Sequence, residues 1–363
     1  MATKKTGISR DLIIHPGETI AELLENRGMT QAELAARAGV SAAFVSNVIA
    51  GKKNISSEFA FALEYVFGIP KTFWMNLQTH YEAELLEYEE CQTVSEVEKT
   101  VRKALCEVVK HLRHAGKIPD DEPLVDSILS LRRFFAVSSL LNLKQIVPNG
   151  VFRMANAAVD PYVLGAWIRI CQLSESETDS ETRLTSDNVD RLIDELKGVM
   201  RDINADIQKD IHLVMARYGI DFSIVQNFRG APVQGYLSRK KSGAYHMSLT
   251  IRGSYADIFW FSLFHEIGHI VNGDIGKASS YIDGGTDEEK EGAADRFASE
   301  KLLNPAEYET FVGKNDFGIE AIKEFADSQK VMPFIVIGRL QKEKRLDYRY
   351  YSDYKIRYKW QEK

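Results

Sequence analysis

Cysteines, long apolar runs and an excess of positive charge are all scarce in this sequence of 363 residues. The three cysteines, Cys91, Cys106 and Cys171, are far apart and form no CxxC pair, which argues against a disulfide framework and a thiolate zinc site. No segment approaches the run of about 20 apolar residues that a membrane helix needs. Residues 1–10 are basic but lack the apolar core of a signal peptide. We therefore expect a cytoplasmic protein that makes no membrane contact.

The charge balance limits the kind of nucleic-acid binding that this protein could perform. Its formal net charge is −6, whereas a protein that coats nucleic acid along its whole surface depends on clustered Lys and Arg. A small DNA-reading domain remains compatible with that average. With 44% hydrophobic residues, the chain can bury the cores of two or three ordinary domains.

Three regions follow one another along the chain, and none of them is an internal repeat. Short helical patterns separated by glycine-containing turns predict a compact helical DNA-binding domain over residues 1–88. Residues 89–205 stay helical but are more polar, with exposed loops expected at 118–123 and 174–186. Residues 206–363 add β-branched and aromatic patterns, which predict strands at 220–225 and 245–251. We predict a mostly helical α+β protein.

The sequence His265-Glu266-Ile267-Gly268-His269 is an HExxH motif within an apolar helical pattern over residues 255–271. Residues i and i+4 share one face of a helix, so both imidazoles can reach one ion. Because the helix is apolar nearly all round, it should be buried, and its ionisable residues need partners. A bound Zn²⁺ would be a sufficient partner, with His265 and His269 as its ligands.

A catalytic zinc usually takes three protein ligands, so a third is expected on a nearby element. Glu291 is the best candidate, on a helix predicted from about 287 to 303. Asp295, one turn later, would orient a ligand histidine through its second ring nitrogen. Glu288 and Glu289 remain alternative ligands, although acids in a first helical turn are common for other reasons. A buried polar cluster without metal, or a degenerate site, is the other interpretation.

If the metal is present, the expected reaction is peptide hydrolysis, with Glu266 as the general base. An extended substrate could pair with an edge strand at 244–251, although an ordinary sheet strand is about equally expected there. Tyr255, His246 and Tyr281 are candidates to stabilise an oxyanion, and the sequence does not choose between them.

A helix-turn-helix pattern lies between residues 30 and 53. Thr30 and Glu33 form a capping-box pattern before a short helix, and Ser41 can cap a second helix over residues 42–50. The second helix would enter the major groove of DNA and present its side chains to base edges. The residues assigned to DNA are Gln31, Ser41, Ala42, Ala43, Ser46, Asn47, Lys52 and Lys53. Of these, Gln31 and the two lysines are expected at phosphates.

Two family resemblances cover most of the chain. His15 to about Glu84 resembles the Xre/Cro-type helix-turn-helix proteins, and specifically the HigA-like antitoxins. The motifs that carry this resemblance are His15-Pro-Gly-Glu18, Thr30-Gln-Ala-Glu-Leu-Ala35, Gly39-Val-Ser41 and Phe73-Trp-Met-Asn-Leu-Gln78. Residues 206–343 resemble the ImmA/IrrE metallopeptidases, a gluzincin-like family. The motifs here are Phe264-His-Glu-Ile-Gly-His269, Glu291 to Ala298 and Val336-Ile-Gly-Arg-Leu-Gln341.

The resemblances imply a homodimeric transcriptional regulator that binds operator DNA and is joined to a zinc endopeptidase. The peptidase would cleave one regulatory protein, either a repressor or a toxin-related protein. They also imply His265, His269 and Glu291 as ligands and Glu266 as base. An antitoxin-like autorepressor with a structural or inactive zinc site is the alternative. A peptidase whose helix-turn-helix contacts a protein partner instead of DNA is another.

Two further sequence patterns are compatible with binding. His111 and His114 have a spacing that could bind metal, but a solvated helix face is the preferred interpretation. The aromatic and basic segment 345–360 could bind single-stranded nucleic acid. A terminal strand packed on the sheet is preferred there.

Overall fold

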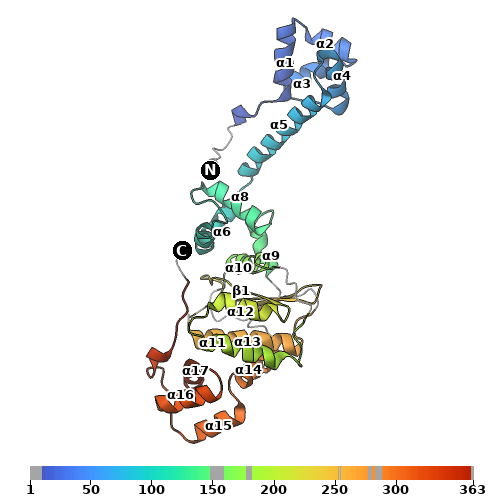
Figure 1. Cartoon of the computed structure of the whole chain (residues 1–363). Coiled ribbons are helices and arrows are strands. Elements are labelled where there is room, and N and C mark those ends of the chain that lie inside the picture. Colours follow the sequence, from blue (N-terminus) through green and yellow to red (C-terminus); the bar gives the residue numbers. More distant parts are fainter. Residues whose placement is uncertain are drawn as a thin grey trace. The chain divides into compact units, whose positions relative to one another are not determined.

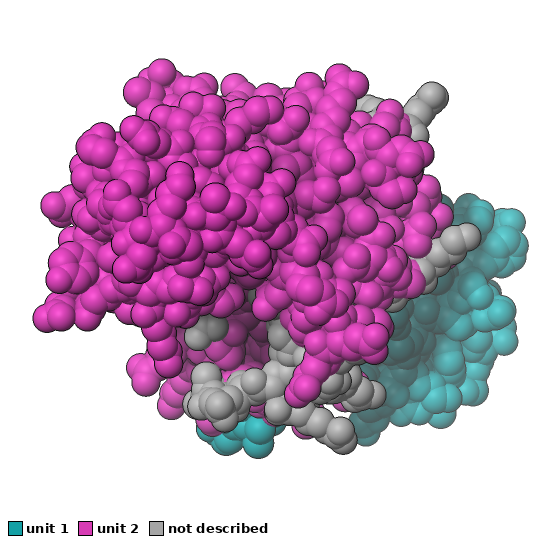
Figure 2. All heavy atoms as spheres, turned by 90° about the horizontal axis from the view of Figure 1, so that it is seen from below, with its two compact units in different colours: residues 1–99, 123–129 teal, residues 100–122, 130–363 magenta. Residues whose placement is uncertain are grey.

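A computed structural model describes residues 10–147, 159–176, 182–251, 253, 255–276, 280–282 and 288–360, with only the backbone of 280–282. The chain forms two compact units, which Figure 2 colours separately. The first comprises Met1–Lys99 and Pro123–Leu129, and the second comprises Thr100–Glu122 and Ser130–Lys363. The predicted domain boundaries at residues 88 and 205 stay predictions. Among the described residues, no helix has the length and apolar character needed to cross a membrane.

The first unit is helical, as the sequence predicts. Its five main helices are α1 (Pro16–Arg27), α2 (Gln31–Ala38), α3 (Ala42–Ile49), α4 (Ser57–Phe67) and α5 (Lys71–Gln92), after a short 3-10 turn η1 (Arg10–Leu12). Side-chain oxygens of Thr30, Ser41 and Ser56 accept backbone N–H groups at three helix starts. Glycines in the left-handed conformation end three of the helices, since a Cβ is strained there.

A shared apolar core holds the first four helices and the start of α5 together. Its members are Ile20, Leu24, Leu34, Ala35, Val45, Val48, Ile55, Phe59, Ala60, Leu63, Phe67 and Trp74. Leu34 and Ala35 of α2 and Val45 and Val48 of α3 belong to this core, so each of these two helices has one buried apolar face. The remaining helices before the sheet are α6 (Glu96–Ala104), α7 (Cys106–His114), α8 (Leu124–Phe135), α9 (Leu143–Ile146), α10 (Pro161–Leu173), α11 (Val189–Arg201) and α12 (Ile207–Ala216), with η2 (Leu140–Asn142) between α8 and α9.

The second unit contains a small sheet with the order β1-β3-β2-β4. Its strands are β1 (Ile220–Ile224), β2 (Gly235–Arg239), β3 (Tyr245–Leu249) and β4 (Ser280–Ile282). β1 runs parallel to β3, whereas β2 runs antiparallel to β3 and to β4. The strands predicted at 220–225 and 245–251 are therefore present, while β2 and β4 were not predicted.

Of the two interpretations that the sequence leaves open for 244–251, the structure shows the ordinary sheet strand and not the edge strand. β3 lies between β1 and β2, and its backbone groups pair on both sides. The edges of the sheet are β1 and β4. Alternating polar and apolar residues indicate only that a strand has two different faces, and the strand order depends on pairing that no local pattern encodes.

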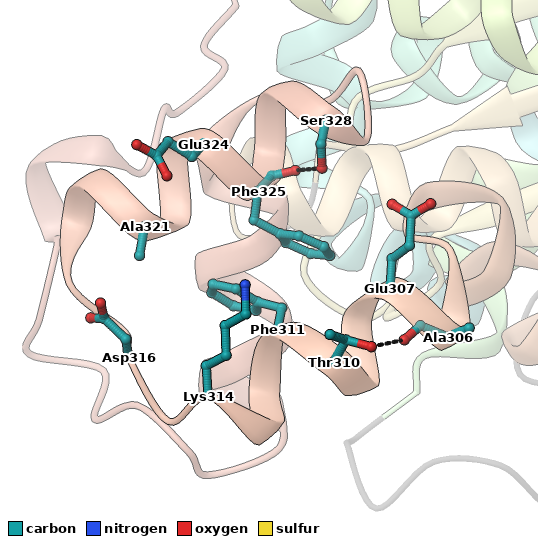
Figure 3. Close-up of a pocket in the computed structure, with 10 residues that line it drawn as sticks. All are labelled: Ala306, Glu307, Thr310, Phe311, Lys314, Asp316, Ala321, Glu324, Phe325 and Ser328. Carbon is teal, nitrogen blue, oxygen red and sulfur yellow. Dashed lines mark hydrogen bonds between the residues drawn. The ribbon is translucent and has the colours of Figure 1, made fainter.

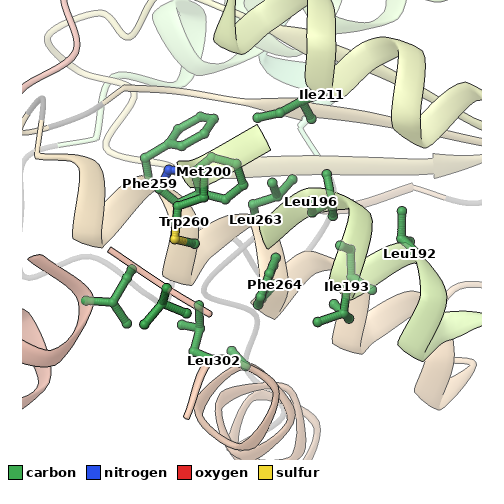
Figure 4. Close-up of a cluster of buried hydrophobic side chains, with 14 of the residues drawn as sticks. Leu192, Ile193, Leu196, Met200, Ile211, Phe259, Trp260, Leu263, Phe264 and Leu302 are labelled. Carbon is green, nitrogen blue, oxygen red and sulfur yellow. The ribbon is translucent and has the colours of Figure 1, made fainter. Parts of the chain in front are cut away.

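Five more helices complete the second unit: α13 (Ala256–Asn272), α14 (Glu288–Leu302), α15 (Pro305–Gly313), α16 (Ile319–Ser328) and α17 (Pro333–Lys342), followed by η4 (Ser352–Tyr354). Helix α13 packs against α14, α17 and strands β2 and β3 (Figure 1). Its apolar residues share one core with those of α11, including Leu192, Leu196, Leu263 and Phe264 (Figure 4). The apolar helix predicted at 255–271 is thus buried as expected.

The segment 345–360 does not form a terminal strand packed on the sheet, which corrects the preferred interpretation. It forms turns and one isolated bridge between Arg357 and Tyr255. The hydroxyl of Tyr358 accepts the indole N–H of Trp260 at 2.8 Å, so the segment packs on α13 instead. Its alternating aromatic and basic residues resemble a strand pattern, but their side chains contact separate elements: Lys355 pairs with Asp257 of α13, and the hydroxyl of Tyr351 donates to the carbonyl of Phe317.

Candidate metal centre and nucleic-acid interface

Helix α13 places both histidines of the HExxH motif on one buried face. The side chains of His265 and His269 are 6% and 0% exposed. Their Nε2 atoms lie 3.0 Å apart, as the i, i+4 spacing predicts for two groups that address one point.

Glu291 reaches the same point from helix α14. Its carboxylate oxygens lie 3.3 Å from Nε2 of His265 and 3.9 Å from Nε2 of His269. The three potential ligand atoms all lie within 4.8 Å of one another. The alternative ligands Glu288 and Glu289 lie exposed in the first turn of α14 and are not part of this group.

Two further carboxylates hold the outward nitrogens of the histidine rings. Nδ1 of His265 lies 2.9 Å from Asp295 Oδ1, and Nδ1 of His269 lies 2.8 Å from Asp274 Oδ2. The hydrogen bond from His265 is the largest influence on the pKa of Asp295, which is lowered from its ordinary value. The structure thus brings Asp295 to the second ring nitrogen of a ligand histidine, as the sequence predicted, and the Asp295 side chain is 53% exposed. Asp274 was missed.

The donor set fits a zinc ion. Two neutral imidazoles and one carboxylate are a ligand combination of catalytic zinc sites, and each histidine has a carboxylate on its other nitrogen. With Nδ1 of each ring directed at a carboxylate, both Nε2 atoms are left as acceptors that face each other and Glu291. A divalent cation between these three groups would be attracted by all of them.

Glu266 lies between the two histidines in the sequence and is fully buried. The start of β2 passes so close to it that a Cβ on Gly235 would lie 1.9 Å from Glu266 Oε1 and 2.6 Å from its Cδ. Only glycine leaves room for the carboxylate in this position. No local sequence pattern marks Gly235, because the close approach joins two residues that are 31 positions apart.

The candidate oxyanion residues are engaged elsewhere or lie outside the described residues. His246 is buried on β3, with Nδ1 2.9 Å from Asp221 Oδ2 and Nε2 2.8 Å from Ser248 Oγ. The hydroxyl of Tyr255 contacts the guanidinium of Arg357. The side chain of Tyr281 lies outside the part that the structure describes.

His111 has a hydrogen-bond partner in the second unit. Its Nδ1 lies 2.8 Å from Gln226 Oε1, and burial lowers the pKa of the ring. It is therefore half-buried against residue 226 rather than on a solvated face, while His114 is exposed. Neither belongs to a group of metal-ligand type among the described residues.

The C-terminal helices also carry an open groove, which is lined by neither the metal-centre residues nor His111 and His114. It has a volume of about 530 Å³ and lies between α15 and α16 (Figure 3). Phe311 and Phe325 both line the groove, and their rings stack with the centroids 4.5 Å apart. None of the predicted site residues lines it.

Helices α2 and α3 form the helix-turn-helix that the sequence predicts. Thr30 Oγ1 accepts the N–H of Glu33 at 3.2 Å, and Ser41 Oγ accepts that of Phe44 at 3.1 Å. The carboxylate of Glu33 pairs with Arg37 rather than returning to the cap, so half of the capping box forms. Helix α1 presses on α3 so closely that a Cβ on Gly17 would lie 2.2 Å from the carbonyl oxygen of Val48.

The residues assigned to DNA lie on the accessible side of this unit. Asn47 is half-buried and the others are exposed: Gln31, Ser41, Ala42, Ala43, Ser46, Lys52 and Lys53. The backbone N–H groups of both lysines donate to the carbonyl of Asn47, at 2.8 and 3.2 Å. The ammonium of Lys53 lies 5.4 Å from the ring centre of Phe44. The turn after α3 thus holds two positive charges beside the predicted reading helix.

Comparisons with known proteins concern the N-terminal region. Residues 20–74 match the family model described as Helix-turn-helix. The antitoxin GraA is 31% identical over 21% of this chain and 84% of its own, with a TM-score of 0.21. The Pseudomonas aeruginosa antitoxin HigA with the higBA promoter is 31% identical over 23% and 90%, with a TM-score of 0.22. A Pseudomonas aeruginosa protein in complex with its operator DNA is 35% identical over 20% and 80%, with a TM-score of 0.20. No curated protein matches the chain.

Proposed function

From the premise that residues 20–74 form a helix-turn-helix domain, we propose that this protein is a DNA-binding regulator joined to a zinc-dependent endopeptidase. The regulator half would bind double-stranded operator DNA as a homodimer. The peptidase half would cleave a specific regulatory protein. The exposure of helix α3 supports DNA binding, and the group of His265, His269 and Glu291 supports the peptidase, so each activity can be tested without the other.

The exposure of helix α3 supports the DNA-binding half. A helix enters the major groove with the side chains of its first turns, and Ala42, Ala43 and Ser46 are exposed there while Val45 and Val48 hold the helix to the core. Asn47 can recognise adenine, and alanine methyl groups can contact thymine. Lys52 and Lys53 supply positive charge for phosphates in a chain whose net charge is negative.

The convergence of His265, His269 and Glu291 on one point carries the peptidase half. When bound there, zinc would act as a Lewis acid toward the scissile carbonyl and toward water. Glu266 follows His265 directly on α13. Its carboxylate would accept the proton of the attacking water and then return it to the leaving amine. Gly235 keeps the start of β2 from displacing that carboxylate.

Metal content tests the peptidase half first. We would measure zinc in the purified full chain beside His265→Ala and Glu291→Ala, after the same controlled reloading. One zinc per chain in the wild type, lost in both variants, is the expected result. No zinc in the reloaded wild type would contradict the proposal. An exposed acid outside the site, Glu300→Ala on the same helix α14, should keep the full zinc content and serves as the control.

An autorepressor with a structural or inactive zinc site is the second candidate function. The complete burial of Glu266 and His269 favours it, because a catalytic group must meet its substrate. Incubating the zinc-loaded wild type and Glu266→Gln with the products of neighbouring genes separates the two. Cleavage by the wild type alone supports the peptidase, whereas intact partners and a DNA shift in a low-salt binding assay support the autorepressor.

A further inference from the structure

The turn that ends helix α13 brings a carboxylate onto one of the two ring nitrogens of His269. Helix α13 ends at Asn272, and Gly273 follows in the left-handed conformation with φ 74°. This reversal lets the N–H of Asp274 donate to the carbonyl of His269 at 3.1 Å. The side chain of Asp274 returns in the same direction, with Oδ2 2.8 Å from His269 Nδ1. Backbone and side chain of one residue therefore both contact His269.

An aspartate is an unfavourable residue for this position unless it has a specific partner. The C-terminal end of a helix carries partial negative charge from its free carbonyl groups, so a carboxylate there is repelled. The side chain of Asp274 is also only 9% exposed, which adds a desolvation cost. The hydrogen bond from the ring Nδ1–H of His269 compensates for the repulsion and for the desolvation cost. A general helix-capping role does not explain an aspartate at this position.

The contact determines which nitrogen of His269 is available. An ionised carboxylate accepts hydrogen bonds but cannot donate them, so Nδ1 of His269 must carry the hydrogen. Nε2 is then the acceptor, and it faces His265 Nε2 at 3.0 Å and Glu291 at 3.9 Å. Asp295 does the same for His265, but from helix α14 and with a side chain that is 53% exposed. The contact to Asp274 is the more buried one, so water competes with it less.

We infer that Asp274 is a positioning residue of the metal centre, which fixes the tautomer and the ring orientation of His269 through the turn at Gly273. The inference rests on the proposed zinc site and adds a residue that the HExxH motif and the third ligand do not include. It predicts that replacing the Asp274 side chain, just beyond the end of α13, lowers the affinity of the metal centre for zinc.

The test compares zinc affinity of the full chain with Asp274→Ala, Asp274→Asn and Asp353→Asn, by competition with a chromophoric chelator. Asp274→Ala should raise the zinc dissociation constant about 10 to 100-fold. Asp274→Asn keeps an oxygen acceptor without the charge and should fall between it and the wild type. Asp353 is an exposed acid in η4, so its variant controls for lost surface charge and should be unchanged.

A second measurement separates positioning from a merely structural role. Co²⁺ in place of zinc gives a visible absorption spectrum that reports the ligand field, and this band should shift in loaded Asp274→Asn. A variant that loses thermal stability without metal, yet binds zinc as tightly as the wild type with an unshifted cobalt band, would overturn the inference while leaving the zinc site intact. If the wild type binds no zinc, the inference and the proposed peptidase fall together.

Discussion

The turn after helix α3 allows a quantitative prediction about DNA binding. Lys52 and Lys53 are exposed and held side by side, since both backbone N–H groups donate to the Asn47 carbonyl. Each phosphate contact contributes about 0.9 to the slope of log affinity against log salt concentration. Replacing both lysines with alanine should therefore flatten that slope by about 1.8. Between 50 and 200 mM salt, the affinity advantage of the wild type should shrink by a factor of about 12.

Fluorescence anisotropy with a labelled promoter fragment, repeated at several salt concentrations, measures this slope. The loss should be similar on an unrelated DNA sequence, because phosphate contacts carry no sequence information. The double replacement by arginine keeps both charges and should retain the wild-type slope. If the alanine variant keeps the wild-type slope, neither lysine contacts phosphate and the orientation proposed for α3 is wrong.

Three further predictions concern close contacts and the metal centre. Gly17→Ala should lower the free energy of unfolding by about 1–3 kcal/mol, because the new Cβ meets backbone atoms of α3. Denaturant titration measures this, and Gly198→Ala, in a helix with open space, should instead stabilise by about 0.5–1 kcal/mol. Gly235→Ala should displace the carboxylate of Glu266 by about 1 Å and reduce peptide cleavage about 100-fold while zinc content stays at the wild-type value. Unimpaired cleavage would remove Glu266 from the base role. Asp295→Ala should weaken zinc binding about 10 to 100-fold in a chelator competition with the fold intact by circular dichroism. Equal affinity in that assay would show that Asp295 does not orient His265.

The sequence predicts the helices of the first unit and the metal helix well, because their information is local. Periodic apolar residues, the caps Thr30 and Ser41, and the spacing of His265 and His269 each act within a few residues. Glu291 was predictable for a different reason. A catalytic zinc needs a third protein ligand, and Glu291 lies on the next predicted helix after the motif.

Contacts set by the path of the chain between elements were not predictable. Asp274 lies in a turn, where an acid next to glycine is ordinary, and only the left-handed Gly273 directs it back to His269. The sequence did not decide whether β3 lies at an edge or inside the sheet, because strand order depends on long-range pairing. Gly235 shows no sequence signal at all, since its importance is the distance between β2 and Glu266.

The packing of helix α11 limits which part of the chain could be exchanged as a unit between proteins. Its Leu192 and Leu196 are fully buried in the same core as Leu263 and Phe264 of the metal helix. The N–H and hydroxyl of Ser176, which follows α10, also bind the buried carboxylate of Asp221 on β1, at 2.6 and 2.8 Å. A segment that begins at residue 206 and is transferred to another protein would lack part of its own hydrophobic core. Recombination that preserves the metal helix must carry these preceding segments with it.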